Sequence, residues 1–160
     1  MAAIPAGTRI GHVHLTVSDL ERSLRFYRDV LGFTETTRYG EDAVFLAAGD
    51  YHHHIGLNTW AGHGAPAPPP GTTGLYHFAI LYPDRRALAG VVHRVLAARV
   101  PLEGAADHGV SEAIYLRDPD GNGVELYRDR PEAEWPRAAD GRLVMHTRPL
   151  DVAALLREAE

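Results

Sequence analysis

The sequence predicts an α+β protein, because one pattern that changes from strand-like to helix-like periodicity is present twice. Residues 11–19 (GHVHLTVSD) recur as residues 76–84 (YHFAILYPD), so that His12 aligns with His77 and Asp19 with Asp84. In each copy a histidine begins an apolar run typical of a strand, and the aspartate stands where a helix N-cap is expected. Since an internal repeat governs the whole fold, we expect two modules of the same βαβββ order.

The first copy predicts a strand over residues 9–17 and then a helix with Ser18 or Asp19 as its N-cap. Apolar residues at helical spacing mark the face of this helix that is expected to be buried, and Gly32 is expected to end it; the face comprises Leu20, Leu24, Tyr27 and Leu31. Three β-type stretches complete the module, near residues 33–38, 43–48 and 52–60.

The second copy repeats this order, with a strand over residues 75–82 and a helix that Asp84 caps. The apolar stripe of that helix is expected to be Leu88, Val91, Val92, Val95 and Leu96. Further strands are expected near residues 100–104, 111–117 and 123–128. Residues 118–123 (DPDGNG) are a dense turn signal that joins the last two strands as a hairpin.

A chain of 160 residues, 45% of them apolar, can bury a core as a single domain over residues 1–160. Module one spans residues 9–60, and module two spans residues 75–128. The connector at 61–74 is rich in Pro and Gly and cannot hold a helix. A tail over residues 129–160 closes with a helix from Leu150 to Glu158, which is expected to expose Leu155 and Leu156 and so to cover the sheet or a partner subunit.

Composition excludes several functional classes. The net charge of -5 and the absence of a basic run give no support for binding to nucleic acid or to an anionic membrane. There are no cysteines, so any metal must be held by nitrogen and oxygen. The first residues lack a signal-peptide pattern, and no apolar run is long enough to span a bilayer, so we expect a cytoplasmic protein.

Three residues have the chemistry of a divalent metal site: His12, His77 and Glu125. Strand side chains alternate, so His12 and His14 share a face, and Glu125 points opposite to its apolar neighbours Val124 and Leu126. Two histidines and one carboxylate with open positions suit non-heme Fe(II), and also Mn or Zn. Taken singly, each could be a hydrogen-bonded structural histidine or a solvent-facing glutamate, but the repeated placement of the histidines favours a metal site.

These stretches resemble the vicinal oxygen chelate superfamily of glyoxalases, bleomycin-resistance proteins and type I extradiol dioxygenases. The resemblance covers residues 9–128 and is most specific in residues 12–33 (HVHLTVSDLERSLRFYRDVLGF) and 118–127 (DPDGNGVELY). It implies that the two modules form a single cup-shaped curved sheet with helices outside, and that His12, His77 and Glu125 hold the metal. Gly56 stands where metal-dependent glyoxalase I carries a second glutamate.

Within that superfamily the motifs resemble most those of catechol 2,3-dioxygenases. Residues 52–57 (HHHIGL) match the stretch that carries their catalytic histidine, which implies that role for His53. Strict alternation would instead put His54 on the face of Gly56, so a β-bulge is expected there. Tyr115, ten residues before Glu125, matches their tyrosine, and His108 matches a further histidine at a spacing that differs by a small gap.

The function implied is extradiol ring cleavage of a catechol-like aromatic with O2, dependent on Fe(II) or alternatively on Mn(II) or Zn(II). The alternatives are a glyoxalase-type isomerase, which Gly56 disfavours, and a thiol transferase, which the lack of a basic cluster beside the motif strands disfavours. A non-catalytic, antibiotic-sequestering protein is a further alternative. The common dioxygenases join two cups in one chain, and this sequence predicts one cup, so we expect a homodimer.

Overall fold

The computed structural model describes residues 3–159. The chain divides into two compact units, unit 1 (Met1–Pro66) and unit 2 (Ala67–Glu160). This boundary lies within the segment 61–74, which contains neither helix nor strand. That the two units form one domain stays a prediction.

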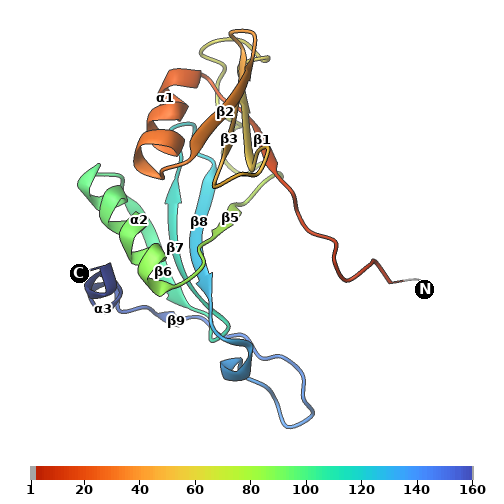
Figure 1. The fold of residues 1–160 in the computed structure, drawn as a ribbon, viewed down its shortest axis with the longest axis vertical. Coiled ribbons are helices and arrows are strands. Elements are labelled where there is room, and N and C mark those ends of the chain that lie inside the picture. Colours follow the sequence, from red (N-terminus) through yellow and green to blue (C-terminus); the bar gives the residue numbers. More distant parts are fainter. Residues whose placement is uncertain (1–2, 160) are drawn as a thin grey trace. The chain divides into compact units, whose positions relative to one another are not determined.

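Unit 1 has the βαβββ order that the repeat predicts (Figure 1). Its elements are β1 (Val13–Thr16), α1 (Leu20–Leu24) with a π-helical continuation (Arg25–Val30), β2 (Thr34–Tyr39), β3 (Ala43–Ala47) and β4 (Ile55–Asn58). The sheet order is β1-β4-β3-β2, in which β1 runs parallel to β4 and the other pairs are antiparallel.

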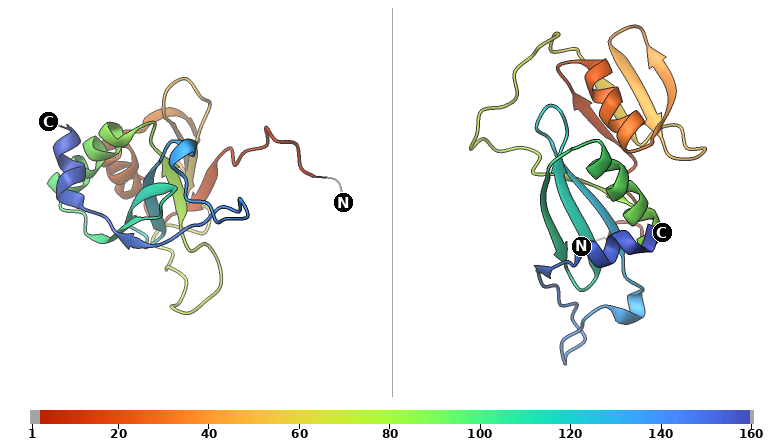
Figure 2. Two further views of the ribbon diagram at one scale, coloured as in Figure 1. Left: turned by 90° about the horizontal axis from the view of Figure 1, so that it is seen from below. Right: turned by 90° about the vertical axis from the view of Figure 1, so that its left-hand side faces the viewer.

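Unit 2 repeats the order with one additional strand. Its elements are β5 (Phe78–Leu81), α2 (Arg85–Ala97), β6 (Leu102–Asp107), β7 (Ser111–Arg117), β8 (Gly123–Asp129), β9 (Arg148–Pro149) and α3 (Val152–Leu156), with 3-10 turns at Glu132–Glu134 and Arg157–Ala159. The sheet order is β5-β8-β7-β6-β9, and α2 covers one face of this sheet (Figure 2). The predicted α+β class with two βαβββ modules is confirmed.

Both predicted helix caps are present. The Asp19 carboxylate accepts from the backbone N–H of Arg22 at 2.7 Å, and that of Asp84 accepts from Ala87 at 2.7 Å. The predicted faces are buried as well: Leu20, Leu24, Tyr27 and Leu31 in unit 1, and Leu88, Val91, Val92 and Val95 in unit 2. Leu96 is 40% exposed although Val95, in the same last turn of α2, is fully buried, because successive residues lie about 100° apart around a helix and Leu96 falls outside the buried face.

The prediction for the closing helix was wrong in one respect. Leu155 is fully buried, because α3 packs against α2 within unit 2. Only Leu156 keeps partial exposure. A short helix that cannot stand alone is thus stabilised inside its own unit, and Leu155 offers no surface to a partner subunit.

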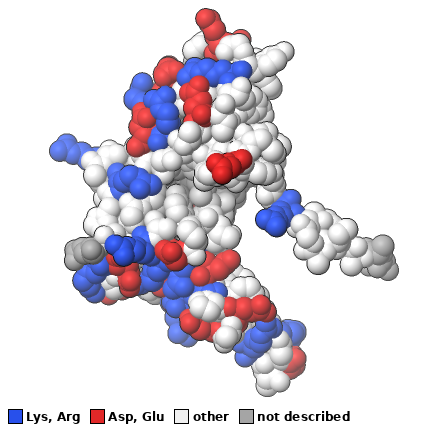
Figure 3. All heavy atoms as spheres, viewed as in Figure 1, with Lys and Arg blue, Asp and Glu red and all other residues white. Residues whose placement is uncertain are grey.

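Charged residues of unit 2 are mostly paired with one another. On the face drawn in Figure 3, Arg and acidic side chains lie next to each other over α3 and the tail. Pairs in the tail include Arg137 with Glu132 and Arg142 with Asp140. Among the described residues, no helix has both the length and the apolar character needed to cross a bilayer.

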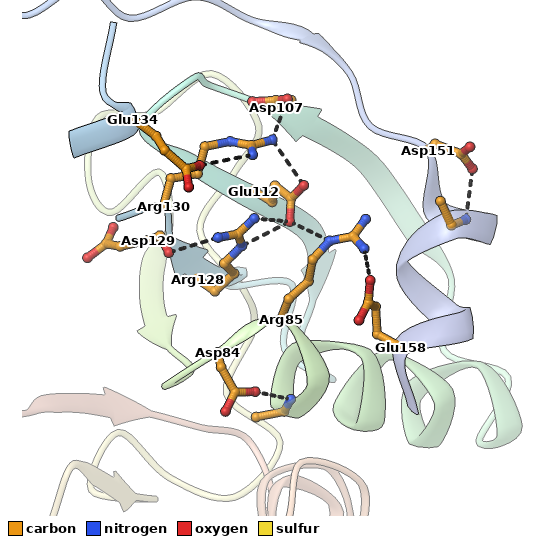
Figure 4. A network of polar contacts seen from close by, with 12 residues as sticks. Asp84, Arg85, Asp107, Glu112, Arg128, Asp129, Arg130, Glu134, Asp151 and Glu158 are labelled. Carbon is orange, nitrogen blue, oxygen red and sulfur yellow. Dashed lines mark hydrogen bonds and ion pairs between the residues drawn. The ribbon is translucent and has the colours of Figure 1, made fainter. Parts of the chain in front are cut away.

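One ion-pair cluster holds the end of the sheet of unit 2 to its helices (Figure 4). Glu112 on β7, with a side chain only 5% exposed, accepts from three guanidinium groups. The donors are Arg85 at 3.0 Å, Arg128 at 2.9 Å and Arg130 at 3.1 Å. Arg85 begins α2, so the side chain of Glu112 points to the face of the sheet that this helix covers.

We expect Glu112→Ala to lower the free energy of unfolding by about 3–5 kcal/mol, because removal of one partner leaves buried charges uncompensated. The matched control is Glu103→Ala, which breaks an exposed pair with Arg117 whose side chains are 48% and 49% exposed. That control should lose about 0–1 kcal/mol. Urea unfolding measures both, and equal small losses would contradict the structural role of Glu112.

Candidate metal centre and active site

The repeat places His12 and His77 at equivalent positions. Each histidine immediately precedes the first strand of its module, which begins at Val13 in unit 1 and at Phe78 in unit 2. The strand registers extend the equivalence, since His14 pairs with Gly56 and Ala79 pairs with Glu125. Gly56 is therefore the counterpart of Glu125 in unit 1, as the sequence predicts.

His77 and Glu125 come together within unit 2. The Nε2 atom of His77 lies 2.9 Å from Oε2 of Glu125, and their side chains are 31% and 12% exposed. Two ligands that each lie about 2.1 Å from one transition metal, at a right angle, are about 3 Å apart, so this spacing fits a shared metal. Among the described residues of unit 2, no third His, Asp or Glu completes a metal-binding group of three. His12, the third predicted ligand, belongs to unit 1.

Gly123 explains how His77 reaches Glu125. A Cβ atom at position 123 would lie 2.2 Å from the carbonyl oxygen of Tyr76 and 2.9 Å from Cβ of His77. Only glycine lets the chain before β5 approach β8 so closely. The sequence predicts Gly123 as the end of the turn and the start of the last strand, but it does not predict this close approach. In the turn the Asp118 carboxylate accepts from the N–H groups of Asp120 and Asn122 at 2.9 and 2.8 Å.

Tyr115 and His108 extend the pair into a row of polar contacts. Tyr115 pairs directly with Glu125 across β7 and β8, and its hydroxyl oxygen lies 3.4 Å from Oε1 of Glu125. The same hydroxyl lies 2.7 Å from Nε2 of His108. Since Glu112 points toward α2, alternation puts Tyr115 on the opposite face of the sheet. The predicted hairpin of the strands that carry Tyr115 and Glu125 is confirmed. The catalytic roles of Tyr115 and His108 stay predictions.

The protonation of Tyr115 follows from its surroundings. Burial, together with the negative charge of Glu125, raises the pKa of Tyr115 to about 12. The phenol is therefore neutral near pH 7 and acts as a hydrogen-bond donor.

A pocket of about 380 Å³ opens beside this row in unit 2. His77, His108 and Tyr115 supply polar groups to its wall, and the small residues Gly104 and Ala106 on β6 line it beside Tyr115, which pairs with Gly104. Small and apolar surface with a few convergent polar groups is typical of a site for a small organic molecule.

His53 lies against His12 in unit 1. Their ring centroids are 4.5 Å apart, and the ring of Phe45 lies 5.0 Å from that of His53. Burial, followed by the proximity of His12 and His52, lowers the pKa of His53, which favours the neutral ring. Because β4 begins only at Ile55, strand alternation does not govern residues 52–54, and the expected bulge is not needed.

His14 fills the position where a fourth ligand would stand. A Cβ atom at Gly56 would lie 2.9 Å from Cγ of His14, so even the smallest side chain there would displace the imidazole. The ring also packs near Trp60, at 5.4 Å between centroids. Unit 1 therefore offers His12 but no carboxylate at the place equivalent to Glu125.

The paired modules and the polar row define a protein of the vicinal oxygen chelate type. A family model of the glyoxalase/bleomycin resistance protein/dioxygenase superfamily matches residues 9–126. The chain belongs to this superfamily.

Two relatives have names that specify a reaction. The chain is 42% identical to a catechol-2,3-dioxygenase of Bacillus subtilis, over 99% of this chain and 55% of that protein. It is 34% identical to biphenyl-2,3-diol 1,2-dioxygenase 3 of Rhodococcus globerulus, over 76% of this chain and 63% of that protein. The chain thus spans little more than half of these relatives' length.

Other relatives differ in the metal that they are named for. A dioxygenase of Geobacillus genomosp. 3, 30% identical over 84% of this chain and 40% of its own, is called manganese-dependent. One of Rhodococcus jostii, 29% identical over 73% of this chain and 42% of its own, is called iron-dependent.

Among solved structures, a glyoxalase/dioxygenase from Nostoc punctiforme matches with a TM-score of 0.65 at 21% identity. The match covers 82% of this chain and 98% of that one. At this identity the likeness shows the fold.

Proposed function

We propose that the chain is a metal-dependent extradiol dioxygenase that cleaves a catechol-like aromatic ring with O2. The row from His77 through Glu125 and Tyr115 to His108, beside the pocket of unit 2, carries this proposal. The names of the two dioxygenase relatives support it. Fe(II) is the metal we propose first, with Mn(II) as the second candidate because relatives are named for each.

In this proposal His12, His77 and Glu125 hold the metal. The metal would supply the electron exchange between the diol and O2 that protein side chains cannot provide. Its three protein ligands leave positions open for small molecules. His12 is assigned by its equivalence to His77 in the repeat.

The remaining side chains handle protons and orientation. His53, a neutral ring next to His12, takes a proton from a diol hydroxyl and returns it later in the reaction. Without substrate the single hydroxyl proton of Tyr115 points to His108; with substrate bound, Tyr115 donates it instead to the diol oxygen that gains negative charge. His108 lies behind Tyr115 and holds its hydroxyl.

A glyoxalase-type isomerase is the second candidate, since a relative from Vibrio cholerae, 28% identical over 76% of this chain and 91% of its own, is named a probable lactoylglutathione lyase. The packing of His14 over Gly56 speaks against it, because no fourth protein ligand can be supplied there.

The decisive experiment is anaerobic reconstitution with Fe(II), followed by a panel of catechols. We expect O2 consumption and the absorbance of a ring-cleaved product with at least one vicinal diol. Parallel loading with Mn(II) identifies the preferred metal. Full metal loading without O2 consumption on any diol would contradict the dioxygenase and direct the assay to hemithioacetals, thiols with epoxides, and simple binding.

We also propose that the working protein is a homodimer. Large apolar side chains are exposed in both units, such as Tyr39, Trp60 and Leu81, and a further surface would cover part of them. A second copy could provide it, given that relatives such as the Bacillus subtilis dioxygenase are nearly twice as long. Light scattering should give a dimer mass, and a monomer at every concentration would contradict this.

A further inference from the structure

The tail of unit 2 closes over His108 just before β9. The Nδ1 atom of His108 lies 3.0 Å from the carbonyl oxygen of His146 and 3.3 Å from the hydroxyl of Thr147. The backbone N–H of His146 donates in return to the carbonyl of His108 at 3.3 Å. The next residue, Arg148, is the strand partner of Asp107 where β9 pairs with β6, so the sheet holds this part of the tail beside His108.

These contacts determine which nitrogen of His108 carries the proton. A carbonyl oxygen can only accept, so Nδ1 must donate to His146. In the neutral imidazole the other nitrogen, Nε2, is then an acceptor. It faces the hydroxyl of Tyr115 at 2.7 Å and can receive that proton.

Gly109 lets the tail come this close. Its φ is +77°, and a Cβ atom there would lie 2.6 Å from Cε1 of His146 and 2.8 Å from Cγ of Pro136. The tail therefore packs directly on the backbone next to His108. The carboxylate of Asp107 fixes the same turn by accepting from the N–H of Gly109 at 2.8 Å.

We propose that His146 and Thr147 are positioning residues: the carbonyl oxygen of His146 and, as a second acceptor, the hydroxyl oxygen of Thr147 hold His108 as the Nδ1–H tautomer with Nε2 turned to Tyr115. The pocket lining includes Thr147, His108 and Tyr115, so the tail is part of the site. The consequence for turnover rests on the proposed function of Tyr115, but the tautomer itself does not.

The test uses the full chain with 15N-labelled histidine and no added metal. Long-range 1H–15N spectra of His108 should show the Nδ1–H tautomer in the wild type. Gly109→Ala, which pushes His146 away, should give a mixture of tautomers. Gly141→Ala is the matched control, since Gly141 also lies in the tail with φ +84° but has no atom within 4 Å of an added Cβ. An Nε2–H ring in the wild type, or identical spectra for both variants, would overturn the proposal.

Thr147 gives a second test that does not disturb the backbone. Thr147→Val removes the hydroxyl and should weaken the tautomer preference, whereas Thr147→Ser should restore it. If ring cleavage is established, Gly109→Ala should lower kcat roughly 10–100-fold with little change in KM, as expected for a misplaced group. A lost tautomer preference without any ring cleavage in the wild type would reject the proposed function alone.

Discussion

Glu125→Ala should abolish both metal binding and ring cleavage. Glu125 is the carboxylate of the proposed ligand set, and its Oε2 atom lies 2.9 Å from His77. Two histidines without the carboxylate leave the charge of a divalent ion less neutralised and one coordination position unfilled. Metal content by elemental analysis and O2 uptake with the best catechol measure the two losses.

The control for this variant is Glu103→Ala. Glu103 also lies beside the pocket of unit 2, but its carboxylate pairs with Arg117 at 2.7 Å and not with a histidine. The metal content of this variant should equal that of the wild type. Retention of a full equivalent of metal by Glu125→Ala would remove Glu125 from the ligand set.

The fold could be predicted because its signals are local. An aspartate before each helix and a stripe of apolar residues at helical spacing act within one or two turns, and both caps are present in the structure. The turn at 118–123 likewise fixes the pairing of Tyr115 with Glu125. These features need no knowledge of distant contacts.

The features that were missed depend on contacts between distant residues. His146 meets His108 across 38 positions through a backbone carbonyl, a group that every residue carries. Gly123 is required by the close approach of the chain at Tyr76, which no turn pattern announces. The apolar pattern of the closing helix is the same whether α2 or a partner subunit covers Leu155. Only the packing of α3 on α2 in the structure shows which surface buries this side chain.

His53→Ala should lower turnover by roughly 10²–10⁴ and leave the metal content intact, because a positioned acid–base group is worth about that much. The ring of His53 lies against that of His12, at 4.5 Å between centroids, and therefore next to a proposed ligand. Its lowered pKa keeps it neutral near pH 7, so it can accept a proton from a diol hydroxyl. Single-turnover rates with the best catechol measure the effect.

The run of three histidines supplies the control. His54→Ala removes an imidazole from the same segment, but Nδ1 of His54 accepts from the backbone of Ala48 at 3.2 Å. That variant should keep a turnover number near that of the wild type. An unchanged rate in His53→Ala would instead make His53 a solvated residue in the segment before β4, whereas loss of metal from this variant would make it a ligand. The proposed role of His53 in proton transfer requires that His53→Ala turns over slowly and still binds a full equivalent of metal.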